Sequence, residues 1–350
     1  MNDPLLGAHQ LKGEQTNTSL VLPNLVMAGA PNGVITKVLR YPAPVPHPDV
    51  EVPEALHRVG YFGVPRVLGF TTAEIPSEGL VTTSITSELI PDAADGFELA
   101  CDYARQNKSF TAQAKQLGAT IAELHNALAQ AFPISTMVDY DAFIDKLQSR
   151  AQEAINAVPA LAKFTDKITH RYTQLRLRDS ALCGHSSLPQ NDECGAPRQQ
   201  RIHGDMHLGQ TLYCNASNAN DVILRPRPAG TASSQKGKWF VLDFEGEPLR
   251  PAGERSAPDF PERDVAGMVR SFAYAQAVGA QNDDLGWAEE AAASFINGYQ
   301  KHRPIDPELL NALVLDKALY EAIYEHRHRP AWLPIPIAAI TQILGENPVS

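Results

Sequence analysis

The chain has 350 residues, of which 43 % are hydrophobic and 20 % are charged, a composition typical of a soluble globular protein long enough for two lobes. The formal net charge of −10 argues against a nucleic-acid-binding surface, which would need clustered lysines and arginines. No signal peptide and no apolar run of membrane-spanning length is present, and four cysteines are too few for a disulfide scaffold, so we expect a cytoplasmic protein.

Short aliphatic and β-branched runs, punctuated by Pro, Gly and Asn, predict strands in the first 90 or so residues. These runs lie at 19–22, 24–27, 33–39, 66–70 and 80–90. One helix candidate interrupts them at 47–60, and we expect Pro53 to lie in its first turn or to break it.

Helical periodicity dominates the rest of the chain, as in the apolar face formed by Ile121, Leu124, His125 and Leu128. A strand-rich front and a helix-rich back predict an α+β protein with a nucleotide-binding lobe at 1–90 and a helical lobe at 91–350. Two stretches rich in Gly, Pro, Ser and Asn, at 178–200 and 214–238, are predicted to be inserted loops.

The stretch HGDMHLGQ, residues 203–210, places Asp205 five residues before Gln210, and a strand-like run further on ends in Asp243. This order follows the logic of phosphoryl transfer from ATP. Asp205 would accept the proton of an attacking hydroxyl, while Gln210 and Asp243 would hold Mg²⁺. For the HGDMHLGQ stretch alone, a polar turn between elements is the alternative.

The front lobe should supply a cation for the phosphates, and Lys37 lies within a strand-like run. Glu51, on the helix candidate that follows, is the expected ion-pair partner of Lys37, with a solvated strand lysine as the alternative. The hydroxyls and amides of EQTNTS could bind phosphate oxygens or cap a turn; these residues are Thr16, Asn17, Thr18 and Ser19. Backbone groups near Glu88 and Ile90 are expected to meet the adenine.

Four stretches together resemble the maltokinases, bacterial sugar kinases of the aminoglycoside-phosphotransferase-like superfamily. They lie at 14–19, 201–210, 241–275 and 316–336, and the resemblance runs from about residue 14 to the end. It implies a bilobal protein-kinase-like fold and Mg²⁺-dependent phosphorylation of maltose by ATP at the anomeric hydroxyl, giving maltose 1-phosphate and ADP. It also implies a place in α-glucan assembly beside trehalose synthase.

The C-terminal helix candidate carries Lys317, Tyr320, Glu321 and Tyr324 on one face. Phenol rings can lie against a sugar while polar tips bond its hydroxyls, although a solvent-facing polar side is the alternative. The resemblance favours sugar binding, because Lys317, Tyr320 and Tyr324 match positions that contact maltose in the family.

The resemblance also assigns supporting roles around the Asp205 loop. Asp264 resembles a helix aspartate that holds this loop through hydrogen bonds. His203 and His207 are predicted to hold the loop backbone, with metal ligation as the alternative. His125, on an apolar helix face, is predicted to be a core histidine.

The maltokinases usually carry an N-terminal cap subdomain ahead of the EQ-x-NTS stretch, whereas thirteen residues precede it here, so we expect the cap to be missing. Two other functions stay open. One is a kinase of another sugar, such as glucosamine. The other is a catalytically silent kinase-like partner of trehalose synthase.

Overall fold

The computed structural model describes residues 3, 5–11, 17–135, 138–183, 198–215, 237–247, 252–280 and 286–345, which fall into two compact units. The first unit comprises Met1–Leu99, Asn126–Phe132 and Gly209–Ser256, and the second comprises Ala100–His125, Pro133–Leu208 and Ala257–Ser350. The unit that contains the front strands therefore also contains Gln210 and Asp243. Thr16 and most of the two predicted insertions lie outside the described residues.

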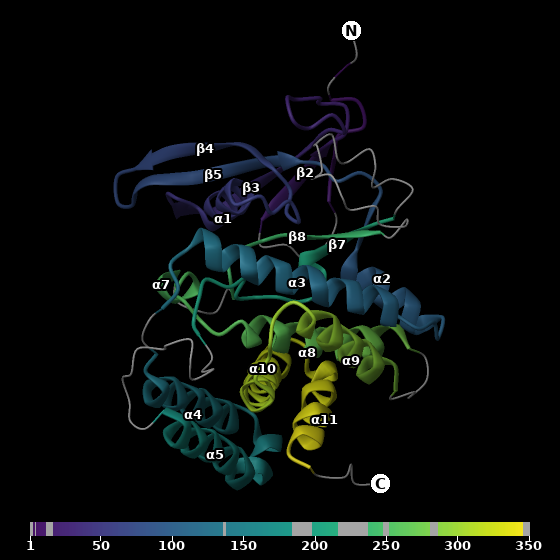
Figure 1. The fold of residues 1–350 in the computed structure, drawn as a ribbon. Coiled ribbons are helices and arrows are strands. Elements are labelled where there is room, and N and C mark those ends of the chain that lie inside the picture. Colours follow the sequence, from purple (N-terminus) through teal and green to yellow (C-terminus); the bar gives the residue numbers. More distant parts are fainter. Residues whose placement is uncertain are drawn as a thin grey trace. The chain divides into compact units, whose positions relative to one another are not determined.

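The N-terminal part of the first unit forms a five-stranded antiparallel sheet in the order β1-β2-β3-β5-β4, of which Figure 1 labels β2, β3, β4 and β5. Its strands are β1 (His9–Gln10), β2 (Thr18–Leu22), β3 (Val34–Pro44), β4 (Val67–Ile75) and β5 (Gly79–Glu88). The prediction of a strand at 24–27 was wrong, because the chain turns there and Met27 makes only an isolated bridge to Ala30. Val26 is 66 % exposed, so this apolar run has no buried face to hold it in a strand.

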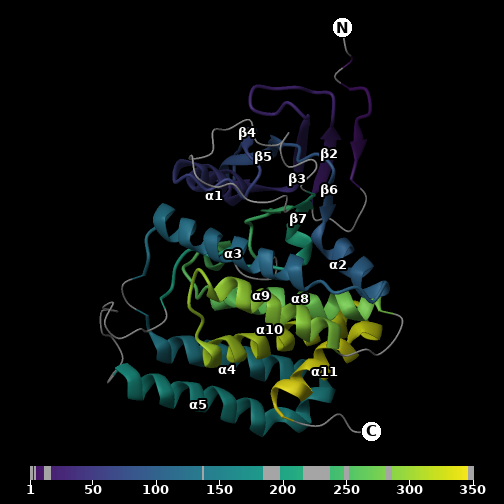
Figure 2. The same ribbon diagram turned by 45° about the vertical axis from the view of Figure 1, so that its right-hand side comes forward.

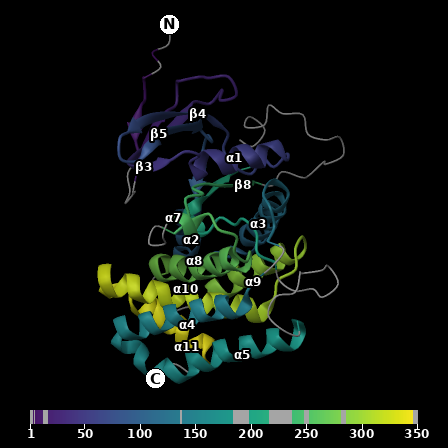
Figure 3. The same ribbon diagram turned by 90° about the vertical axis from the view of Figure 1, so that its left-hand side faces the viewer.

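Helix α1 (Pro48–Arg58) lies beside this sheet, as Figure 3 shows, and buries Val52 and Leu56 completely. The prediction for Pro53 was wrong, because this proline is the sixth residue of a helix that continues past it. His47 caps the helix by accepting a hydrogen bond from the Asp49 N–H, and Pro48 occupies the first turn, where a missing N–H costs nothing.

A second, three-stranded sheet brings distant segments of the first unit together. Its strands β6 (Ala93–Asp95), β7 (Thr211–Cys214) and β8 (Lys238–Val241) pair in the order β6-β7-β8. Ile90, Cys214 and Phe240 form the buried cluster beneath it. Because Thr211 pairs with Val241, the residues just outside this pair, Gln210 and Leu242, are neighbours.

The second unit is largely helical, and Figure 2 shows its helices stacked against one another. The helices that contribute to it are α2 (Gly96–Arg105), α3 (Thr111–Ala131), α4 (Tyr140–Ala157), α5 (Thr165–Cys183), α8 (Glu262–Gly279), α9 (Gly286–Gln300), α10 (Pro307–His328) and α11 (Pro334–Ile343); a short α7 (Ala252–Arg255) belongs to the first unit. Helix α10 packs on α8, α4 and α11.

Close packing in this unit depends on glycines. A Cβ on Gly118 of α3 would lie 2.0 Å from the Phe295 carbonyl oxygen of α9, and one on Gly298 would lie 1.9 Å from the Lys115 carbonyl oxygen. The predicted apolar face of α3 is confirmed, because Ile121 and Leu124 are fully buried. Among the described residues, no helix has the length and apolar content needed to span a membrane.

Candidate active site

Lys37, on β3, is the centre of a charged cluster in the first unit. Its ammonium nitrogen lies 2.7 Å from Asp49 Oδ2 and 3.1 Å from Asp243 Oδ1, and it also bonds the Glu245 carboxylate. The prediction that Glu51 is the ion-pair partner of Lys37 was wrong, because Asp49, two residues earlier on α1, makes this ion pair. Two residues turn an α-helix by about 200°, so Asp49 and Glu51 point to different sides of it.

Asp49 links three elements of the first unit. While Oδ2 binds Lys37, Oδ1 accepts the Phe244 N–H at 2.6 Å, and the Asp49 N–H donates to His47 Nδ1 at 3.1 Å. Burial lowers the pKa of His47 below its usual value, which keeps Nδ1 an acceptor. The cap therefore fixes where α1 begins. It thereby also fixes the Asp49 carboxylate, which bonds Lys37 on β3 and the Phe244 N–H in the turn after β8.

Asp243 adopts a left-handed backbone conformation, with φ of 60°. Aspartate tolerates this conformation better than most residues, and such backbone positions cluster at functional sites. The flanking backbone is held on both sides, because Leu242 N donates to Gln210 O at 2.9 Å and Phe244 N donates to Asp49. Gln210 Nε2 lies 3.3 Å from Asp243 Oδ2, so the structure brings the two predicted metal residues together.

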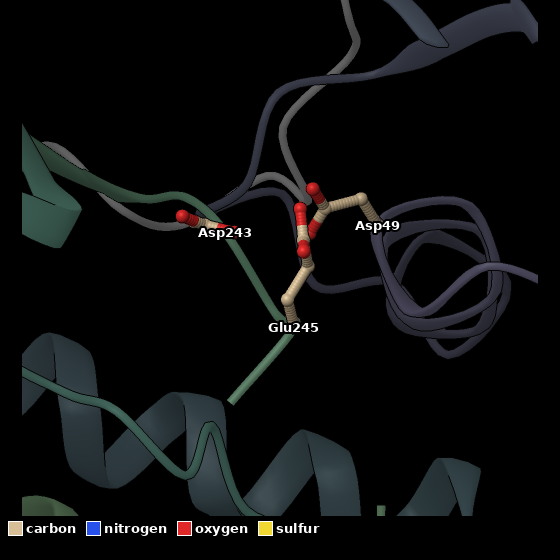
Figure 4. Close-up of side chains that lie close together, drawn as sticks. All are labelled: Asp49, Asp243 and Glu245. Atoms are coloured by element: carbon tan, nitrogen blue, oxygen red, sulfur yellow. The ribbon is translucent and has the colours of Figure 1, made fainter. Parts of the chain in front are cut away.

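The donor set of this cluster fits a divalent cation. Asp49, Asp243 and Glu245 each offer a carboxylate oxygen within 4.8 Å of the others. Figure 4 shows the Asp49 and Glu245 carboxylates side by side, with Asp243 on the neighbouring strand-to-turn segment. Burial disfavours the charged form of Lys37, but the three carboxylates outweigh it and raise the pKa of Lys37 above its usual value. One ammonium against three carboxylates leaves an excess of negative charge, and hard oxygen ligands are those that Mg²⁺ prefers.

The other nucleotide-side predictions lie on the same unit. Ser19 pairs with Lys37 across β2 and β3, so the two side chains emerge on the same face of the sheet. Asn17 is buried, donates to Glu245 and accepts from the Arg40 N–H, which ties the start of β2 to the cluster.

The end of β5 carries the residues that were expected to meet adenine. Glu88 makes two bonds to Arg66: its backbone N–H donates to the Arg66 carbonyl, and its carboxylate accepts the Arg66 N–H. The Ile90 side chain is part of the buried cluster beneath the second sheet. The adenine contact stays a prediction.

The Asp205 loop belongs to the second unit, where Asp264 of α8 holds its backbone. The carboxylate of Asp264 accepts the N–H groups of His203 at 2.8 Å and Gly204 at 2.9 Å, the geometry that the resemblance implied. Burial alone would raise the pKa of Asp264, but hydrogen bonds from His125 and this backbone outweigh burial and lower it. Asp264 is thus an ionised, fully buried acceptor.

His125 extends this buried network. Its Nε2 lies 3.0 Å from Asp264 Oδ2 and its Nδ1 lies 2.7 Å from the Tyr299 hydroxyl. An ionised carboxylate can only accept, so Nε2 carries the proton and Nδ1 accepts from the phenol. Burial lowers the pKa of His125, in agreement with a neutral ring. The prediction of a core histidine is confirmed, because His125 is completely buried.

The loop itself presents Asp205. Gly204 has φ of 88°, and His203 Nδ1 accepts the Asp205 N–H at 3.3 Å. A Cβ on Gly267 of α8 would lie 2.2 Å from the Met206 carbonyl oxygen, so only glycine allows the helix to approach the loop this closely. His207 is partly exposed, and its predicted role stays a prediction.

Helix α10 supplies the predicted sugar-binding residues. Lys317 Nζ lies 3.3 Å from Asp205 Oδ1 and 4.9 Å from the centre of the Tyr320 ring. The Tyr324 ring stacks obliquely on His328. Glu321 departs from the prediction, because it is turned toward α8, where it forms a buried ion pair with Arg270 at 2.8 Å. Burial raises the pKa of Glu321 despite this partner.

Sequence reasoning missed Asp49, Glu245 and His47. The sequence did contain a signal for Asp49. An acidic residue in the first turn of a helix, here after His47 and Pro48, is stabilised by the helix dipole more than one further along the helix. Glu245, two residues after Asp243, lies in one of the four stretches that carry the family resemblance, but no role was assigned to it. Only the fold brings its carboxylate to Lys37.

Comparisons with known proteins place this geometry in context. A glucosamine kinase of Mycolicibacterium smegmatis is 27 % identical over 97 % of this chain and 80 % of its own length. A solved glucosamine kinase in complex with glucosamine, ADP and inorganic phosphate has a TM-score of 0.69 at 23 % identity, covering 98 % of this chain and 81 % of its own.

An aminoglycoside phosphotransferase from Alicyclobacillus acidocaldarius has a TM-score of 0.53 at 12 % identity, covering 96 % of this chain and 89 % of its own. No protein-family model matches the chain. Homologues and structural neighbours are thus glucosamine kinases and aminoglycoside phosphotransferases. The predicted fold class, an α+β bilobal kinase-like fold, is confirmed.

Proposed function

We propose that this protein transfers the terminal phosphoryl group of ATP to a sugar hydroxyl, with glucosamine as the first candidate acceptor. The observation that carries the proposal is the pairing of β3 Lys37 with Asp49 and Asp243, beside Gln210. A strand lysine, a helix carboxylate and a metal-binding aspartate are the parts that kinases use to hold nucleotide phosphates. Glucosamine is favoured because the relative from Mycolicibacterium smegmatis that aligns over nearly the whole chain carries that name.

Each residue has a role in this proposal. Lys37, kept charged by its three carboxylates, would orient the ATP phosphates, with Ser19 on the same face and Glu88 and Ile90 beside the adenine. Gln210 and Asp243 would hold Mg²⁺, which neutralises charge on the phosphates when it is bound. Asp205 would accept the proton of the sugar hydroxyl, on a loop fixed by Asp264.

Maltose, phosphorylated at its anomeric hydroxyl to maltose 1-phosphate, is the second candidate reaction. One observation favours it. The ammonium of Lys317, next to Asp205, is followed on α10 by the rings of Tyr320 and Tyr324, and aromatic rings suit a second sugar ring. Glu321 is left out of this proposal, because its carboxylate is committed to Arg270.

The test is steady-state ADP release with Mg·ATP and a panel of glucosamine, glucose and maltose. We expect turnover on at least one sugar, and we expect Asp243→Asn to lower kcat by at least about 10³-fold because the metal loses its principal carboxylate. Asp102→Asn, at an exposed site on α2, is the matched control and should keep full activity. No release with any sugar, or an active Asp243→Asn, would overturn the proposal.

A further inference from the structure

Among the residues that the structure describes, Lys317 of α10 forms an ion pair with Asp205, the proposed catalytic base. Lys317 Nζ lies 3.3 Å from Asp205 Oδ1, and the two side chains are only 18 % and 19 % exposed. Solvent screens such a pair less than an ion pair on the surface. The ammonium also lies over the Tyr320 ring, which stabilises a positive charge at this position.

The neighbouring acids of α10 are already matched with cations. Glu321 pairs with Arg270, and Glu325 pairs with Arg329 at 2.8 Å while accepting from the Tyr274 hydroxyl. Glu321 and Glu325 are therefore each paired with an arginine. A positively charged acceptor placed here would have to compete with Lys317 for Asp205.

We propose that Lys317 is a specificity-determining residue that selects the acceptor by charge. A cation fixed on the base favours sugars whose substituents next to the reacting hydroxyl are uncharged and disfavours an ammonium there. The inference rests on the proposed function, in which Asp205 is the base. For glucosamine, whose amine would have to lie next to the reacting hydroxyl, it means that Lys317 weakens the binding of the protonated form and leaves the neutral amine as the form that is phosphorylated.

Glucosamine and glucose test this directly, because they differ only in an amine or a hydroxyl at one carbon. We measure kcat/KM for both sugars with the wild type, Lys317→Met, which keeps the length and removes the charge, and Lys317→Arg, which keeps the charge. Lys163→Met is the matched control, because Lys163 lies on the exposed surface of the same unit, its ammonium 4.6 Å from the Phe164 ring centre.

The ratio of kcat/KM for glucosamine to that for glucose should rise about tenfold in Lys317→Met, as expected for losing a like charge several ångströms away in a partly screened site. It should stay unchanged in Lys317→Arg and Lys163→Met. Calorimetric affinities of the two sugars, measured on the same variants, give the same ratio if Lys317→Met turns over too slowly. If Lys317→Met is active and its ratio equals that of the wild type, the role of Lys317 in selecting the acceptor is refuted while the proposed function stands. If the wild type is inactive on every sugar, the proposed function is overturned as well.

Discussion

Two charged clusters, one in each unit, balance charge in opposite ways. In the first unit, one ammonium, that of Lys37, is shared by Asp49, Asp243 and Glu245, and the Asp243 side chain is 36 % exposed. In the second unit, a single carboxylate, that of Asp264, is fully buried and accepts hydrogen bonds from His125 and two backbone N–H groups.

The first cluster is therefore suited to binding a ligand, whereas the second is suited to fixing the backbone of the loop next to it. An excess of carboxylates that is partly open to solvent can accept a further cation with little rearrangement. A buried carboxylate whose acceptor positions are filled by hydrogen bonds has nothing left to offer a ligand, and it fixes the loop next to it. Substitutions in the first cluster should therefore change ligand affinity most, and substitutions in the second should change stability most.

The largest effect is expected from Asp264→Ala, which would leave the N–H groups of His203 and Gly204 and the ring of His125 without their buried acceptor. Losing one partner of a buried charged network costs about 3–5 kcal/mol of unfolding free energy. Asp264→Asn keeps the shape and one oxygen, so it should lose roughly half as much. Urea unfolding followed by circular dichroism measures both, and wild-type stability in Asp264→Ala would refute the holding role.

A smaller and different effect is expected from Asp49→Asn. Removing the charge that binds Lys37 should cost about 2 kcal/mol of nucleotide affinity, roughly thirtyfold in Kd, because hydrogen bonds to charged groups are worth about that much. Glu51→Gln, on the same helix but outside the cluster, is the matched control and should bind Mg·ADP like the wild type. Calorimetric titration distinguishes them, and equal losses in both variants would mean that α1 presents a different face.

Much of the framework could be predicted from the sequence, because burial follows periodicity. The apolar face of α3 and the strand that carries Lys37 are local patterns of hydrophobic residues. The spacing of Asp205 and Gln210 was equally local, as was the strand that ends at Asp243. These features need no knowledge of distant neighbours.

Pairing partners could not be predicted in the same way. Whether Asp49 or Glu51 faces Lys37 depends on where α1 begins, and that is set by a cap at His47. Whether Glu321 faces a sugar or Arg270 depends on how α10 packs against α8, which no local pattern encodes. In both cases the error lay in which side of the helix the side chain projects from.

The smallest expected effect is a dependence of folding stability on pH, which tests whether the His125 ring in the second cluster is uncharged. The pKa of His125 is lowered in the folded protein, whereas an unfolded histidine titrates near 6.5. Stability from this residue is therefore fully present above about pH 6.5 and is lost as the pH falls, because the unfolded chain then takes up a proton that the folded chain refuses.

Between pH 7.5 and 5.5 this amounts to about 1 kcal/mol, since one pH unit below the unfolded pKa is worth at most about 1.4 kcal/mol. The lowered pKa of Asp264 acts only in more acidic solution, as that carboxylate stays ionised across this range. His125→Gln should therefore lose less thermal stability than the wild type over the same interval, and His170→Gln, at an exposed position of α5, should behave like the wild type. Equal losses of Tm in wild type and His125→Gln would show that the ring is already charged in the folded state, and that the buried network holds its loop with an ion pair rather than with a neutral hydrogen bond.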